Sequence, residues 1–201
     1  MRRERIGFIE EETYLEIERR ASEKSEYFAG EMFAMAGASE RHNLIVANLI
    51  FELKGRLKNT PCRVYPGDMR LKIDASGLYT YPDVMVVCGE RRFADENDDT
   101  LRNPDIIVEV LSDSTERYDR GVKFGHYRKL ESLKEYLLVS QNSRKIERYF
   151  KNENGNWELT ETDDRHPSIR LAAIACELDL DGVYDGIALP GESGSPSASR
   201  A

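Results

Sequence analysis

The sequence lacks the features of membrane and secreted proteins. Its wholly apolar runs are short, such as the five residues from Val84 to Cys88, and the longest has six, whereas a membrane-spanning helix needs roughly 20 apolar residues. Residues 1–20 mix basic and acidic side chains and contain neither the apolar segment nor the cleavage site of a secretory signal. We therefore expect no membrane association and a cytoplasmic location.

Cysteine is scarce, with three residues in the chain: Cys62, Cys88 and Cys176. Their odd number and wide separation indicate neither a disulfide framework nor a zinc site of the C-x-x-C type. We expect each cysteine to serve mainly in packing.

An excess of positive charge is also absent, because 29 Lys and Arg against 37 Asp and Glu leave a net charge of −8. This excludes the broad basic surface of a protein that coats nucleic acid nonspecifically. One local basic segment remains. It runs from Arg117 to Lys129 and has five basic residues against the single acid Asp119.

The 201 residues, 40% of them hydrophobic, suit one domain with a core of its own. No linker-like segment divides the chain before its last dozen residues. We assign residues 1–189 to a single domain. The Gly-, Ser- and Pro-rich residues 190–201 are predicted to be a disordered tail.

Hydrophobic periodicity predicts the order of the elements. A surface helix is expected over residues 9–20, a hairpin over 25–37 with Gly30 at its turn, and a helix from Ser39 to about residue 58. Strands are predicted over 69–73, 84–88, 105–111, 135–140, 145–150 and 157–160, and a helix with a capping box is predicted from about 115 to 130. The mixture indicates an α/β or α+β fold with one mixed sheet.

Glu109 is the misfit in this pattern, because it lies within the apolar strand 105–111. A buried ionised carboxylate costs several kcal/mol unless it is paired, protonated or bound to a metal. Asp83 begins the other apolar strand, at 84–88. Two acids on neighbouring strands form a natural oxygen site for Mg²⁺ or Mn²⁺.

The following helix adds Asp119, Lys123 and Tyr127, whose spacing of four residues places them on one helix face. Lys123 could then point at the two carboxylates. A polarised phosphate, an activated water and a positive charge at the transition state are the requirements of phosphodiester hydrolysis.

The ordered segments YPDVMVVCG, PDIIVEVLSDST, DRGVKFGHY and EYLLVS resemble the Uma-two family of restriction endonucleases, which is similar to the PD-(D/E)XK nuclease fold. The resemblance extends from about Thr13 to Asp185 and includes SEYFAGEMFAMAG followed by His42. It implies a restriction-endonuclease-like mixed central sheet flanked by helices. It also implies a metal-dependent DNA endonuclease that could act as a homodimer.

Carried over residue by residue, the resemblance makes Asp83 and Glu109 the metal ligands. The nuclease pattern places a lysine two residues after the second acid, but this chain has Leu111 there. The resemblance suggests that the lysine has migrated to the helix as Lys123. The supporting candidates at the site are Glu31, His42, Asp119 and Tyr127.

Each assignment has a structural alternative. Asp83 could be a turn residue after Pro82, and Glu109 could form a structural ion pair with Lys123. Asp119 and Lys123 could be an ordinary helical pair, Tyr127 and His42 could be packing residues, and Glu31 could be a solvated surface residue.

Two other functions compete with the nuclease. The first is a nuclease-fold domain that binds nucleic acid or a protein partner but no longer cuts, a hypothesis motivated by the net charge and by Leu111. The second is a glycosidase that uses two carboxylates, but no aromatic platform for a sugar is evident in the sequence.

Overall fold

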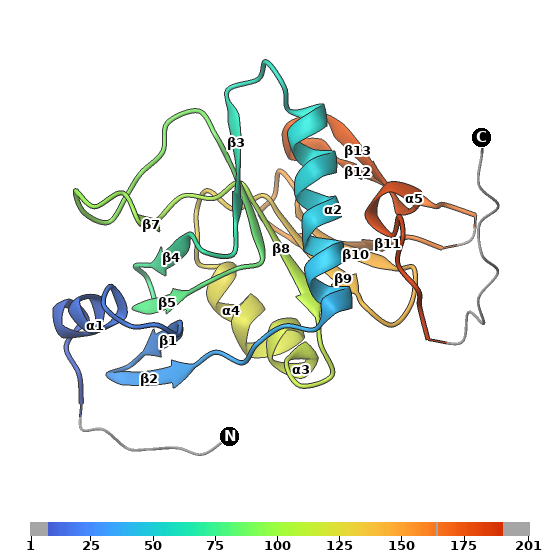
Figure 1. Ribbon diagram of the computed structural model, residues 1–201. Helices are drawn as coiled ribbons and strands as arrows, with labels where there is room; N and C mark the ends of the chain where they lie inside the picture. The colour runs from blue at the N-terminus through green and yellow to red at the C-terminus, as the bar shows by residue number, and fades with distance from the viewer. Residues whose placement is uncertain (1–7, 164, 191–201) are drawn as a thin grey trace.

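The computed structural model describes residues 8–163 and 165–190, and Figure 1 shows their arrangement. Within these residues the strands form a six-stranded sheet, a five-stranded sheet and a separate hairpin. The six-stranded sheet has the order β11-β10-β9-β8-β6-β3, in which β8 and β9 run parallel. Its strands are β3 (Cys62–Pro66), β6 (Val84–Cys88), β8 (Ile106–Leu111), β9 (Glu135–Ser140), β10 (Ile146–Lys151) and β11 (Trp157–Glu161).

The five-stranded sheet has the order β2-β1-β5-β4-β7 and carries the N-terminal part of the chain. The short helix α1 (Glu11–Glu18) packs against it through Tyr14, which stacks on Tyr27. The strands are β1 (Ser25–Phe28), β2 (Glu31–Ala34), β4 (Arg70–Ile73), β5 (Leu78–Thr80) and β7 (Thr100–Leu101).

Helix α2 (Glu40–Arg56) covers one face of the six-stranded sheet, as Figure 1 shows. Ile45, Leu49 and Leu53 recur every four residues along one side of α2 and are completely buried against that face. The hairpin of β12 (Ser168–Leu171) and β13 (Cys176–Asp179), with helix α5 (Leu180–Val183), completes this layer.

The other face of the sheet packs against a helical segment and the five-stranded sheet. The segment consists of α3 (Glu116–Tyr118), a π-helical stretch over Asp119–Lys123 and α4 (Phe124–Tyr127). A second core joins all three parts and contains Ile107 of β8, Tyr127 of α4 and Leu71 of β4. Figure 1 shows α3 and α4 to the right of β1 and β2 and below β8. Any polar side chain on this face of β8 is therefore enclosed.

Most predicted elements are present, and the α+β class with helices flanking the sheets is confirmed. Gly30 has φ +82° at the β1–β2 turn, and Gly155 has φ +79° at the β10–β11 turn. These are conformations that glycine adopts without steric cost.

The sequence interpretation was wrong in two respects. First, the strands divide between two large sheets, because β1, β2, β4, β5 and β7 pair among themselves. Second, the helix after Thr115 ends at Tyr127 and has no capping box. The Thr115 side chain makes no cap bond, and the Ser112 hydroxyl accepts the Thr115 N–H instead at 3.2 Å.

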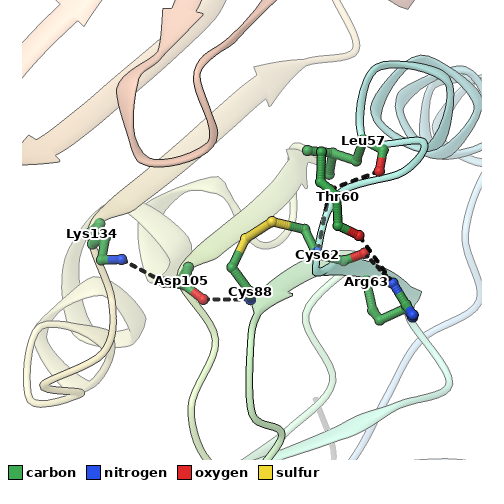
Figure 2. Close-up of a disulfide and its surroundings, with 7 residues drawn as sticks. All are labelled: Leu57, Thr60, Cys62, Arg63, Cys88, Asp105 and Lys134. Carbon is green, nitrogen blue, oxygen red and sulfur yellow. Dashed lines mark hydrogen bonds and ion pairs between the residues drawn. A yellow bond between two sulfur atoms is a disulfide. The ribbon is translucent and has the colours of Figure 1, made fainter.

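The cysteine prediction is corrected as well, because Cys62 and Cys88 form a disulfide. The antiparallel register of β3 and β6 places the two residues directly opposite each other, although 26 positions separate them in the sequence. Figure 2 shows the bond and the Asp105 carboxylate, which accepts the Cys88 N–H at 2.7 Å and pairs with Lys134. Cys176 is a free, half-buried thiol, in keeping with the prediction.

None of the helices in residues 8–163 and 165–190 combines the length and hydrophobicity that a membrane span requires. Residues 191–201 of the expected tail lie outside the described part of the chain.

Candidate functional site

Asp83, the residue before β6, links the six-stranded sheet to α2. Its Oδ2 accepts the backbone N–H of Val110 in β8 at 2.7 Å, and its Oδ1 lies 3.1 Å from Nε2 of His42. The Asp83 side chain keeps 21% of its surface exposed. Its carboxylate is therefore fixed by two neighbours but is still open to solvent.

His42 owes its position to the start of α2. The Ser39 side chain caps that helix by accepting the His42 N–H at 3.1 Å. This places the imidazole in the first helical turn, over the end of the sheet where Asp83 lies. The structure thus brings together two of the residues that the sequence selected.

Glu109 occupies the middle of the buried face described above. Because Val84 pairs with Val108, Asp83 and Glu109 lie side by side on adjacent antiparallel strands. Glu109 is only 4% exposed. Its Oε1 accepts the Tyr127 hydroxyl at 2.6 Å and lies 2.8 Å from Nζ of Lys123.

Lys123 is the positive centre of the site and is 6% exposed. Its Nζ lies 2.8 Å from Glu109, 3.5 Å from Glu26 and 3.6 Å from Asp119. Asp119, Lys123 and Tyr127 are all buried on the same side of the helical segment, as their spacing predicted. The π-helical stretch over Asp119–Lys123 is a form that is rare overall and frequent at functional sites.

The protonation behaviour follows from burial and crowding. Burial raises the pKa of Glu109, against the opposing charge of Lys123. Burial also raises the pKa of Asp119. Burial alone would lower the pKa of Lys123, but the surrounding carboxylates, above all Glu109, outweigh it and hold that pKa well above its usual value. Lys123 is therefore a permanent cation among carboxylates.

Tyr127 is fully buried, and burial raises the pKa of its hydroxyl well above the usual value. The hydroxyl stays protonated and donates to Glu109. Tyr127 thus combines packing with a hydrogen bond to the site.

Glu26 is the acid that sequence reasoning missed. It lies in β1 of the five-stranded sheet, and its Oε1 faces Lys123 and also accepts the Thr80 hydroxyl. The sequence pattern gave only weak evidence that the Glu26 side chain would lie in the site. Glu26 neighbours the buried Tyr27, and only the packing of one sheet over the other directs its side chain toward the helix. Glu31, which the sequence suggested instead, is exposed in β2 beyond the Gly30 turn.

The basic side chains of the segment from Arg117 to Lys129 are of two kinds: some are buried or ion-paired, and the others are exposed. Lys123 is buried in the site, and Arg120 pairs with Glu116 and Glu147. Arg117, Arg128 and Lys129 are exposed. Three of the five basic side chains are therefore available to an anionic partner.

The acidic side chains of the site are of the donor type that hard divalent cations prefer. Asp83, Glu109 and Asp119 carry carboxylate oxygens, the ligands that Mg²⁺ and Mn²⁺ prefer. In the described part of the chain, no group of three or more His, Cys, Asp or Glu side chains converges closely enough to hold a metal ion. The Lys123 ammonium lies against Glu109 instead.

Comparisons with known proteins identify relatives of this chain. Two proteins of Synechocystis sp. strain PCC 6803 are similar in sequence. "Uncharacterized protein sll1609" is 42% identical over 79% of this chain and 90% of its own length, and "Uncharacterized protein slr1290" is 37% identical over 88% and 92%.

A crystal structure from Anabaena variabilis, titled as a "putative nuclease belonging to DUF820", superposes with a TM-score of 0.71 at 17% identity. The match covers 86% of this chain and 96% of that one, and it confirms the nuclease-like fold. Residues 11–181 match the Uma2 family, described as "Putative restriction endonuclease". Because this match spans most of the sequence, the chain belongs to the Uma2 family.

Proposed function

We propose that this chain is a Mg²⁺- or Mn²⁺-dependent endonuclease that hydrolyses phosphodiester bonds in DNA. Asp83 and Glu109 hold the metal, and Lys123 acts on the hydrolytic water. The family and the fold support a nuclease in general. The metal, the residue roles and the DNA substrate are the further steps of the proposal.

The observation that carries it is the crowding of acidic side chains around one ammonium. Glu109, Asp119 and Glu26 lie within 3.6 Å of the single ammonium of Lys123, and Asp83 lies beside Glu109 on the adjacent strand. Desolvation and mutual repulsion make such a cluster costly. A divalent cation bound to the carboxylate oxygens would offset the repulsion between the acidic side chains.

The proposed metal ligands differ in how they are held. Asp83 is oriented from two sides, by the Val110 N–H and by His42, which is the arrangement expected of supported ligands. Glu109 is oriented by the Tyr127 hydroxyl. A bound cation in such a site polarises a phosphate oxygen and lowers the pKa of a bound water.

The chain's own groups then have separate tasks. Lys123 can hold a water by a hydrogen bond and place positive charge beside a phosphate that gains negative charge in the transition state. His42 keeps Asp83 oriented at the solvent-facing side of the site. The exposed Arg117, Arg128 and Lys129 can contact backbone phosphates of the DNA.

The decisive experiment incubates purified wild type, Asp83→Asn and Glu109→Gln with supercoiled plasmid and with single-stranded DNA, in Mg²⁺, Mn²⁺ or EDTA. We expect metal-dependent cutting by the wild type and its loss in both variants, with circular dichroism showing intact folds. Glu158→Gln, at an exposed position in β11 far along the sheet, is the matched control. Equal cutting by a folded site variant and the wild type would refute the assignment.

A second candidate is a domain that binds nucleic acid without cutting it. The ion pair of Lys123 with Glu109 favours it, because the ammonium compensates the Glu109 carboxylate without a metal ion. This candidate predicts DNA binding that weakens steeply with salt and is unaffected by EDTA. Binding that is unchanged between low and high salt would count against it.

A further inference from the structure

Glu26 reaches the site from the five-stranded sheet, not from the six-stranded sheet or the helical segment. It belongs to β1, whereas Glu109 and Asp119 belong to β8 and the helical segment. The hydroxyl of the fully buried Thr80 in β5 donates to Glu26 Oε1, the same oxygen that faces Lys123. The Glu26 side chain is 14% exposed. The hydrogen bond from Thr80, within the same sheet, thus orients the Glu26 carboxylate independently of Lys123.

The same faces of β1 and of the helical segment meet at a second point. Phe28, two residues after Glu26, contacts the ring of His126, three residues after Lys123, with centroids 4.8 Å apart and in an edge arrangement. Residues two apart in a strand share a face, as do residues three apart in a helix. The contact therefore fixes the position of β1 relative to the helical segment and holds Glu26 opposite Lys123.

We propose that Glu26 is a positioning residue that holds the Lys123 ammonium in place when Glu109 serves as a metal ligand. The inference rests on the proposed function and extends it to a residue of the N-terminal sheet. Glu26 itself touches neither the metal nor the substrate.

The need for such a residue follows from the charges. Once Glu109 shares its charge with a divalent cation, it attracts Lys123 less, and the cation repels the ammonium in a poorly screened interior. Lys123 then depends on its other two carboxylates. Asp119 is on the same helix and moves with Lys123, whereas Glu26 is anchored to another sheet through Thr80. Glu26 is the neighbour that can fix the ammonium relative to the rest of the molecule.

The kinetic test uses four variants: Glu26→Gln, Glu26→Asp, Lys123→Ala and the double variant Glu26→Gln with Lys123→Ala. We expect Glu26→Gln to lower kcat about tenfold to a hundredfold, the usual cost of a displaced catalytic group, while KM for plasmid DNA and the Kd of Mn²⁺ measured by calorimetry stay unchanged. Glu26→Asp should restore part of kcat. In the Lys123→Ala background, Glu26→Gln should have no further effect.

Glu23→Gln is the matched control, because Glu23 is an exposed glutamate just before β1. Weaker Mn²⁺ binding by Glu26→Gln would make Glu26 a metal ligand and overturn the inference. An additional loss of kcat in the Lys123→Ala background would show that Glu26 does not act through Lys123, and would overturn it too.

Crystal structures test whether Glu26 positions the Lys123 ammonium, and they do so without a measurement of activity. We expect Nζ of Lys123 to lie on Glu26 in Mn²⁺-soaked wild type, and to shift in Glu26→Ala. If the wild type does not cut DNA, the proposed function fails but this comparison still stands. An ammonium at the same position in wild type and Glu26→Ala would overturn the positioning role, whether or not the protein is a nuclease.

Discussion

Nζ of Lys123 lies 2.8 Å from Oε1 of Glu109, on the buried face of β8 where Leu111 occupies the position that the nuclease pattern gives to lysine. The helical segment thus supplies the positive charge beside Glu109, because β8 has no lysine at position 111. Lys123→Met should destabilise the fold by ~3–5 kcal/mol, because it leaves Glu109 buried without its cation. Urea unfolding measures this change.

The double variant Lys123→Met with Glu109→Gln should lose less stability than the sum of the two single variants, because it removes both charges together. Additive losses in this cycle would mean that the two side chains do not interact.

Leu111 offers a test of the migrated lysine. It lies on the same side of β8 as Glu109 and packs in the core that includes Phe124. Lys123→Ala should be nearly inactive in plasmid cleavage, and adding Leu111→Lys should restore part of the rate by returning an ammonium to the Glu109 side. Val110→Lys is the control. Val110 faces α2 on the opposite side of the sheet, so no rescue is expected.

Two outcomes of the rescue experiment would contradict the prediction. Full activity in Lys123→Ala would remove the migrated-lysine assignment. Equal rescue from positions 110 and 111 would show that the restored rate does not depend on which face of β8 carries the charge.

The Cys62–Cys88 disulfide should contribute to stability by closing a loop between residues 26 positions apart. We expect reduction, or the double variant Cys62→Ser with Cys88→Ser, to lower the free energy of unfolding by ~2–4 kcal/mol. Thermal unfolding with and without a reductant measures this, and Cys176→Ser serves as the control. A non-reducing peptide map without the linked peptide would contradict the pairing.

Asp99 should make the N-terminal sheet sensitive to acid. The Arg19 guanidinium beside it holds the pKa of the Asp99 carboxyl well below its usual value of 3.8, and Asp99 also pairs with the buried Arg70 at 3.0 Å. Because the folded-state pKa is lowered, the stabilisation is fully present above pH 3.8 and is lost as the pH falls toward the folded value.

Asp99→Asn should therefore cost ~1–2 kcal/mol near pH 7, and the difference from wild type should shrink below about pH 4. Urea unfolding across this pH range measures it. Asp98→Asn, at an exposed neighbour, provides the baseline. A difference between wild type and Asp99→Asn that persists undiminished at low pH would rule out the charge as its origin.

Local patterns in the sequence determined much of the fold. The spacing of Ile45, Leu49 and Leu53 specified α2, and the apolar strands around Asp83 and Glu109 specified β6 and β8. Glu109 was identifiable because an acid in a fully apolar strand must find compensation. The spacing of Asp119, Lys123 and Tyr127 placed them on one helix face. These features depend only on residues close together in the chain.

Tertiary structure decided the rest, because it depends on which distant segments meet. The register of β3 and β6 paired Cys62 with Cys88, although the two residues lie 26 positions apart in the sequence. The packing of the N-terminal sheet over the helical segment brought Glu26 to Lys123 and left Glu31 at the surface. A strand pattern shows which side chains share a face, but only the assembled sheets determine what that face contacts.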